Sequence, residues 1–170
     1  MSGSPREFVL KYDFESGPPP GMSRGQVVPG PPRPGSSFCA LGTVNPYALN
    51  LPWVVAIDAT AGLFTWSSDT MVSFDYWLGV GGEVIEVQYW NIDRDQNYEL
   101  HLPRVTTGGW AHVDVRLSDT LGAVDRSRPQ EDGDRVRSLE IIGGPSLTAP
   151  IYVDNVRIWR VPSSVGSTSR

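Results

Sequence analysis

The sequence predicts an all-β fold, a two-sheet antiparallel β-sandwich of the jelly-roll type. Three observations support this prediction. Apolar and polar residues alternate with a period of two through most of the chain, and turn signals rich in Gly separate the alternating segments. No segment carries a helical apolar stripe over three turns. About ten short strands at such spacing are typical of a two-sheet sandwich.

The length of 170 residues favours one domain over residues 1–170, because domains usually hold about 100–200 residues. We expect its core between about residues 8 and 160, and a frayed Ser-rich tail over 161–170. A chain of this length can bury a sizeable core without disulfides or metals.

Ten strands are expected in order along the chain. They are Phe8–Glu15, Ser37–Gly42, Trp53–Ala59, Gly62–Ser67, Met71–Val80, Glu83–Asn91, Tyr98–Leu102, Trp110–Leu117, Arg135–Ile142 and Ile151–Trp159. The polar segment Asp93–Gln96 is predicted to be a hairpin loop that joins two directly paired strands.

Glycine and proline are concentrated in one segment. The chain has 18 Gly and 15 Pro, and residues 16–37 hold five of these glycines and seven of these prolines. Only one strand's length of chain precedes this segment, so we interpret it as a long loop between the first two strands. Since proline cannot donate to a sheet ladder, we expect loop or polyproline-like backbone from Ser16 to Ser37.

Charge and composition exclude several classes of partner. A net charge of -5 without a long basic run argues against non-specific nucleic-acid binding. No apolar run approaches the roughly 20 residues of a membrane span, and no signal peptide is visible at the N-terminus. The single cysteine, Cys39, excludes an internal disulfide framework and a multi-cysteine zinc site, and we expect a buried structural thiol.

The four consecutive strands from Met71 to Leu117 each present one apolar and one polar face, because side chains alternate across a sheet. If these strands neighbour one another, their polar faces form one surface that holds both histidines of the chain. The candidate ligand-binding residues on it are Trp77, Glu86, Gln88, Trp90, Glu99, His101, His112, Asp114 and Arg116.

This combination suits carbohydrate, because a sugar ring packs on an aromatic face and its hydroxyls bind carboxylates, amides and guanidinium groups. The alternative is the ordinary solvated face of a sandwich.

Several segments carry a resemblance to a known family. They are Tyr12–Gly17 (Tyr-Asp-Phe-Glu-Ser-Gly), Val72–Leu78, Gly109–Val115 and Ile151–Ile158 (Ile-Tyr-Val-Asp-Asn-Val-Arg-Ile). Over roughly Phe8 to Arg160 the chain resembles galactose-binding-like jelly rolls, which include many carbohydrate-binding modules of bacterial polysaccharide-degrading enzymes. The resemblance implies non-catalytic polysaccharide binding by a module of a larger secreted or cell-surface protein.

The resemblance also implies a structural calcium ion shared by the first and last strands. The residues that match the family's ligands are Glu15 and Asp154, with Asp13 as a further candidate. Calcium prefers such carboxylate and carbonyl oxygens. The alternative is that these side chains are solvated turn residues.

Two other function classes stay open at this point. One is a jelly-roll domain for protein–protein interaction or assembly. The other is a small glycan-active hydrolase or lyase, since Glu86 and Glu99 fall on the same predicted face. The chain lacks the Glu-x-Asp-x-x-Glu spacing of known hydrolases, and no predicted helix could complete a Gly-x-Ser-x-Gly nucleophile elbow, so no catalytic residue is assigned. A zinc site at His101 and His112 is disfavoured by their spacing.

Overall fold

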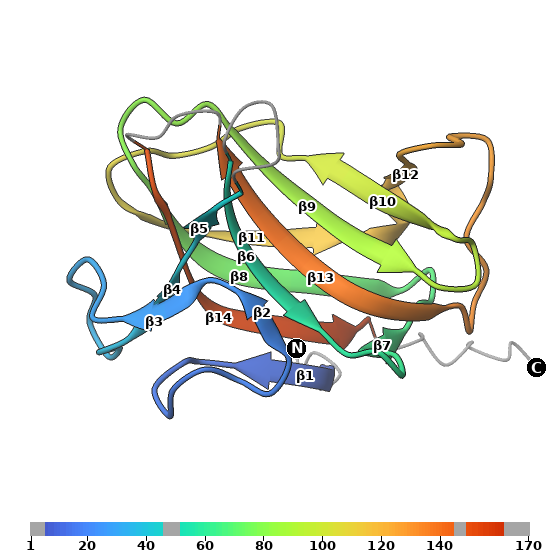
Figure 1. The fold of residues 1–170 in the computed structure, drawn as a ribbon, viewed down its shortest axis with the longest axis horizontal. Helices are drawn as coiled ribbons and strands as arrows, with labels where there is room; N and C mark the ends of the chain where they lie inside the picture. The colour runs from blue at the N-terminus through green and yellow to red at the C-terminus, as the bar shows by residue number, and fades with distance from the viewer. Residues whose placement is uncertain (1–5, 46–51, 145–148, 162–170) are drawn as a thin grey trace, which may run out of the picture.

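The computed structural model describes residues 6–45, 52–144 and 149–161. They form two antiparallel β-sheets packed face to face, which confirms the predicted sandwich. Figure 1 shows strands β9, β10 and β13 of one sheet lying in front of β8 and β11 of the other. Within these ranges, no helix is long and apolar enough to cross a membrane.

The six-stranded sheet, which we call sheet A, contains both the first and the last strand. Its order is β11-β8-β14-β4-β3, and β1 pairs with the C-terminal half of β14. The strand bounds are β1 Glu7–Tyr12, β3 Gln26–Val28, β4 Cys39–Leu41, β8 Thr70–Leu78, β11 Trp110–Arg116 and β14 Ile151–Arg160.

The eight-stranded sheet, which we call sheet B, has the order β12-β10-β9-β13-β6-β2, with β5 paired to β6 and β7 to β13. The bounds are β2 Met22–Arg24, β5 Thr43–Val44, β6 Trp53–Asp58, β7 Phe64–Thr65, β9 Val84–Asn91, β10 Gln96–His101, β12 Leu121–Gly122 and β13 Arg135–Gly144. A 3-10 turn, η1 (Leu117–Asp119), follows β11.

The core lies between the two sheets and is built from the apolar faces that the alternation predicts. Val72, Phe74 and Leu78 of β8 are fully buried, as are Ile85 and Val87 of β9. Burying such side chains stabilises the fold by about 1.5–3 kcal/mol each, which makes this layer the main source of stability.

All ten predicted strands are present, with shifted ends. The first strand stops at Tyr12 because Phe14 adopts a left-handed backbone with φ 61°. The prediction of strand-free backbone over residues 16–37 is wrong, since β2 and β3 lie inside this segment. Both fall in its proline-free middle, where each backbone N–H can donate to a neighbouring strand. β2 pairs with sheet B and β3 with sheet A.

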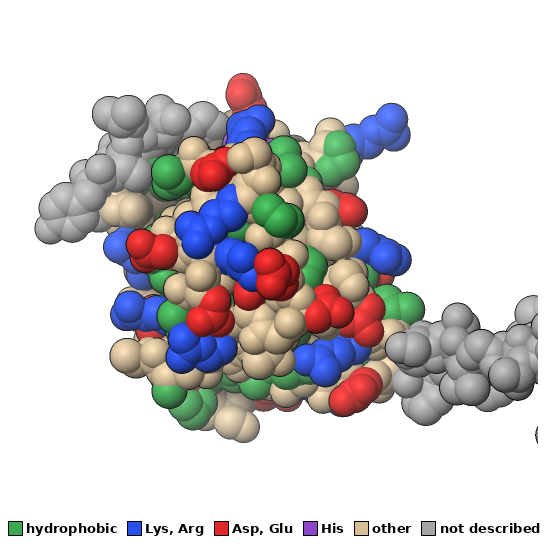
Figure 2. Space-filling view, turned by 90° about the vertical axis from the view of Figure 1, so that its right-hand side faces the viewer, with side chains coloured by type: hydrophobic (Ala, Val, Ile, Leu, Met, Phe, Trp, Pro, Cys, Tyr) green, Lys and Arg blue, Asp and Glu red, His purple; other side chains and the backbone are tan. Residues whose placement is uncertain are grey.

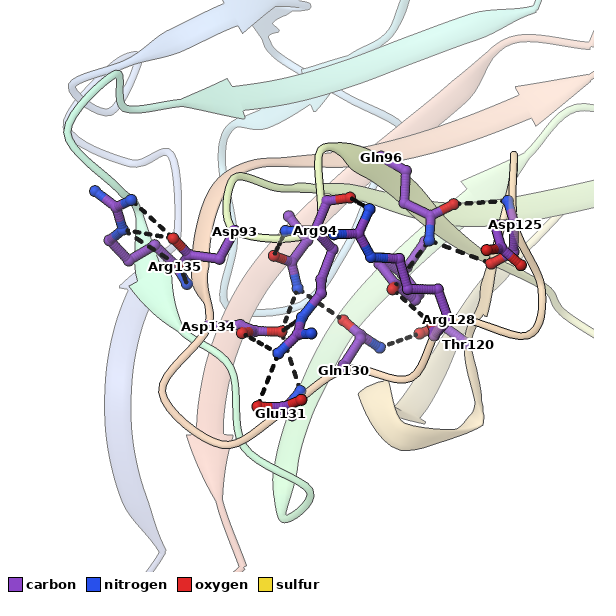
Figure 3. Close-up of polar contacts among 12 residues, drawn as sticks. Asp93, Arg94, Gln96, Thr120, Asp125, Arg128, Gln130, Glu131, Asp134 and Arg135 are labelled. Carbon is purple, nitrogen blue, oxygen red and sulfur yellow. Dashed lines mark hydrogen bonds and ion pairs between the residues drawn. The ribbon is translucent and has the colours of Figure 1, made fainter.

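The predicted hairpin loop between β9 and β10 is confirmed, and it is tied to the loop before β13. Arg94 Nε donates to Asp134 Oδ2 at 2.8 Å, and Arg94 Nη2 donates to Asp134 Oδ1 at 3.0 Å (Figure 3). Figure 2 shows this end of the sandwich, where basic and acidic side chains are interspersed. We interpret these ion pairs as a clamp that holds the two loops together.

Candidate functional site

The predicted single polar face is divided between the two sheets. Strands β8 and β11 belong to sheet A, whereas β9 and β10 belong to sheet B. The chain therefore crosses between the sheets after β8 and again after β10, and the two polar faces lie on opposite sides of the sandwich. The prediction that all nine residues share one surface is wrong: Trp77, His112, Asp114 and Arg116 lie on sheet A, and Glu86, Gln88, Trp90, Glu99 and His101 lie on sheet B.

The outer face of sheet B carries a hollow around Trp90. Register places Trp90 opposite Asn97 of β10 and opposite Ser138 of β13, and Ser138 lies opposite Asp58 of β6. These four residues form one row across four strands. Together with Arg137 and Glu140 they line a hollow of about 220 Å³. Trp90 itself is half-buried, so part of its side chain is accessible.

Polar groups around this hollow are held in place by one another. Arg137 Nε donates to Asp58 Oδ2 at 3.2 Å, which orients both the guanidinium and the carboxylate. Two residues before Trp90 along β9, a second row crosses the sheet and joins Glu99 of β10, Gln88 of β9 and Glu140 of β13. Carboxylate, amide and guanidinium groups thus flank the indole ring, and each can hydrogen-bond a ligand hydroxyl.

Two carboxyl groups of this face are less acidic than ordinary glutamates. Burial, together with the charge of Glu99, raises the pKa of Glu86, and His101 offsets this only partly. His101 Nε2 lies 3.1 Å from Glu86 Oε2. Burial also raises the pKa of Glu140, although the nearby Arg24 opposes the shift.

The outer face of sheet A is partly covered by the proline-rich segment. Arg33 Nη1 donates to Asp154 Oδ2 at 3.1 Å, and Arg33 Nη2 donates to Asp75 Oδ2. The Arg33 guanidinium lies 5.1 Å from the Trp110 ring centroid, and Trp110 Nε1 donates to the Pro31 carbonyl at 3.2 Å. We call residues 29–36 the strap, since they lie across the middle of this sheet.

Beneath the strap, Asp75 is the centre of a hydrogen-bond network. Burial disfavours its ionised form, but hydrogen bonds from Arg33, Asn155 and His112 outweigh burial and lower the pKa of Asp75. His112 Nδ1 lies 2.6 Å from Asp75 Oδ1, and Asn155 Nδ2 donates to Asp75 Oδ2 at 2.9 Å. These contacts leave Asp75 and His112 engaged with the protein itself.

The other predicted sheet A residues offer a less continuous surface. Trp77 is half-buried and packs edge-on against Tyr152, with 5.6 Å between ring centroids. Asp114 and Arg116 lie farther along β11 and are exposed. Cys39 is buried as predicted, and burial together with the charge of Asp154 raises the pKa of its thiol to about 11.

The calcium ligands implied by the resemblance are brought together only in part. The Ser36 hydroxyl lies 2.8 Å from both Glu15 Oε1 and Asp154 Oδ2, and its single proton can be donated to either carboxylate. Asp13 instead accepts a hydrogen bond from the Glu15 backbone N–H.

As arranged, these groups do not fit a calcium cage. The Arg33 guanidinium already binds Asp154, and three internal donors hold Glu15 and lower its pKa. The described residues include no cluster of three or more acidic, His or Cys side chains suited to a metal. The calcium ion implied by the resemblance is thus untested, and the present arrangement of these side chains predicts that EDTA does not affect stability.

Five residues around the Trp90 hollow were missing from the sequence-based set. Asn97 lies just before the start predicted for its strand at Tyr98, and Asp58, Arg137, Ser138 and Glu140 lie on β6 and β13, whose outer faces were not assigned. The alternation in β13 is interrupted by a register shift between Val136 and Ser138, which hides its polar face in the sequence.

No protein-family model and no curated protein sequence matches this chain. Solved structures with the same fold are found. The xylan-binding domain of family 22 from Paenibacillus barcinonensis has a TM-score of 0.61 at 13% identity, covering 96% of this chain and 100% of that chain. The family 11 carbohydrate-binding module of a cellulosomal cellulase of Clostridium thermocellum has a TM-score of 0.57 at 14% identity, covering 95% and 97%.

A third similar structure is the C-terminal family 22 carbohydrate-binding module of a Clostridium thermocellum protein. Its TM-score is 0.54 at 12% identity, with 94% of this chain and 96% of that chain covered. At such identities the likeness establishes the fold. The predicted resemblance to jelly-roll carbohydrate-binding modules is thus confirmed at the level of architecture.

Proposed function

We propose that this chain binds polysaccharide, without catalysis, on the outer face of sheet B. The observation that supports the proposal is the hollow in which Trp90 lies among Asp58, Asn97, Arg137, Ser138 and Glu140. We further propose that the chain acts as a module of a larger secreted or cell-surface protein, in keeping with the carbohydrate-binding modules that share its fold.

The chemistry of this hollow matches a sugar ring. The accessible part of the Trp90 indole offers a flat apolar surface, on which the C–H face of a pyranose can pack. Around it, the Asp58 carboxylate and the Arg137 guanidinium are mutually oriented at 3.2 Å, and Asn97 lies directly opposite Trp90. Charged partners make stronger hydrogen bonds than neutral ones, so these groups can fix the orientation of the ring hydroxyls.

A polysaccharide longer than one sugar can extend over the neighbouring row. Rows on one face of a sheet are two residues apart, about 6.6–7 Å along the strand. Glu99, Gln88 and Glu86 continue the polar surface from the Trp90 row toward His101. This surface holds more carboxylates than cations, so we expect it to prefer an uncharged polysaccharide.

Isothermal titration calorimetry against a panel of neutral polysaccharides tests the proposal. We expect the wild-type chain to bind at least one member, Trp90→Ala to abolish that binding, and Trp77→Ala on the opposite sheet to retain it. The polysaccharide should yield no new reducing ends. A folded wild-type chain that binds no member of the panel, or that forms a Trp90-dependent oligomer instead, would contradict the proposal.

A further inference from the structure

A cavity of about 400 Å³ lies at the edge of sheet A, away from the Trp90 hollow. Its walls come from the end of β1, the middle of β14 and the Pro18–Pro20 segment. The volume falls within the range of roughly 300–1,000 Å³ that small-molecule sites occupy. None of the nine ligand-binding residues predicted from the sequence lines it.

Two cations face each other on the wall of this cavity. Lys11 of β1 and Arg157 of β14 are direct cross-strand partners, and both line the cavity. Like charges directly opposite one another destabilise a sheet. The Lys11 ammonium lies 3.8 Å from the centroid of the Phe8 ring, while the Arg157 side chain makes no hydrogen bond or ion pair with any other described residue. A bound anion would offset their repulsion.

Backbone strain is concentrated at the same place. Phe14 and Asn155 have φ values of 61° and 49°, and both line the cavity. They are two of the three non-glycine residues with positive φ in the described part of the chain. Positive φ is rare for a bulky residue such as Phe14, and such strain occurs preferentially at ligand sites.

We propose that this cavity is a second binding site, specific for an acidic sugar such as a uronic acid residue. Arg157 and Lys11 supply donors for the carboxylate, since a guanidinium binds carboxylates in a bidentate manner. The Asp13 carboxylate accepts hydrogen bonds from the ring hydroxyls. Tyr12 and the prolines form an apolar wall for the ring. A single anionic group fits better than a densely charged ligand, because Asp13 would repel further negative charge.

This site is independent of the proposed face on sheet B and has the opposite charge preference. The sheet B face is acidic and should prefer neutral sugars, whereas two cations and one carboxylate line the cavity. Each site can therefore be removed without the other, and failure of one proposal can be told from failure of the other.

Titration of the 15N-labelled chain with sodium glucuronate, with glucose and sodium acetate as comparison ligands at equal ionic strength, tests the proposal. We expect glucuronate alone to shift the amide resonances of Lys11, Tyr12 and Asn155. Arg157→Gln should weaken glucuronate on the order of tenfold, as loss of one charge-assisted contact implies. Lys11→Gln removes the second cation, on the opposite strand β1, and should also weaken glucuronate binding.

Two controls make the result decisive. Arg116→Gln removes an exposed cation from another strand of the same sheet and should leave glucuronate affinity unchanged, as should Trp90→Ala. Equal shifts with glucose or acetate, an undiminished affinity in both folded variants Arg157→Gln and Lys11→Gln, or no shift near the cavity at saturating glucuronate would overturn the proposal.

Discussion

Replacement of Arg33 by Met should destabilise the domain severely, although Arg33 lies in a proline-rich loop. Its guanidinium is bound between Asp75 and Asp154, whose side chains are only 11% and 1% exposed. Asp75 and Asp154 are also direct cross-strand partners, so their charges repel when no cation separates them. Removal of one member of a buried ion pair costs about 3–5 kcal/mol. That is a large share of the roughly 5–15 kcal/mol that holds a typical domain folded.

Urea unfolding and thermal melting at pH 7 measure this loss. A cost of about 3–5 kcal/mol corresponds to a melting temperature lower by roughly 6–20 °C for a chain of this size. Arg104→Met is the matched control, because Arg104 is exposed and has no contact of this kind among the described residues. Asp75→Asn should restore part of the stability in the Arg33→Met background. A loss below about 1 kcal/mol would instead show that Arg33 contributes no more than an exposed ion pair does.

Three further predictions concern stability. Arg94→Met should lower the urea midpoint, because it leaves the Asp134 carboxylate without its cation; an unchanged midpoint would contradict the clamp. Burial raises the folded-state pKa of Glu140, so its ionisation makes stability fall as pH rises from about 4.3 through the raised value. Glu140→Gln should therefore raise the melting temperature at pH 7 but not at pH 4, and an equal gain at both would contradict this account. EDTA should leave the melting temperature unchanged, whereas a drop that calcium restores would support a metal at Glu15 and Asp154.

The fold was largely predictable because each strand's burial pattern is a local property of the sequence. The alternation from Val72 to Leu78 identifies which side chains face the core whatever the neighbouring strand is. Which strand a given strand pairs with, however, is not a local property of the sequence. The turn at Gly81 and Gly82 could equally have led into a hairpin of one sheet, but it leads across to sheet B. The residues of each polar face were therefore identified, while their grouping on one surface was not.

The strap and the Trp90 hollow were beyond sequence reasoning for the same physical reason. Arg33 and Asp154 are 121 residues apart in the chain, and no local pattern connects a proline-rich loop with the last strand. Asp58 and Arg137 are 79 residues apart and meet only because β6 pairs with β13. The outward position of Trp90 was predicted correctly, since it follows from the alternation within β9 alone.

We propose that sheet B, and not sheet A, carries the polysaccharide. The indole N–H resonances of the tryptophans, followed during titration with a neutral oligosaccharide that the chain binds, test it most directly. We expect a large shift of the Trp90 resonance and none at Trp77 or Trp110; the Trp110 indole already donates to Pro31 of the strap. A shift at Trp77 or Trp110 with Trp90 unchanged would contradict it.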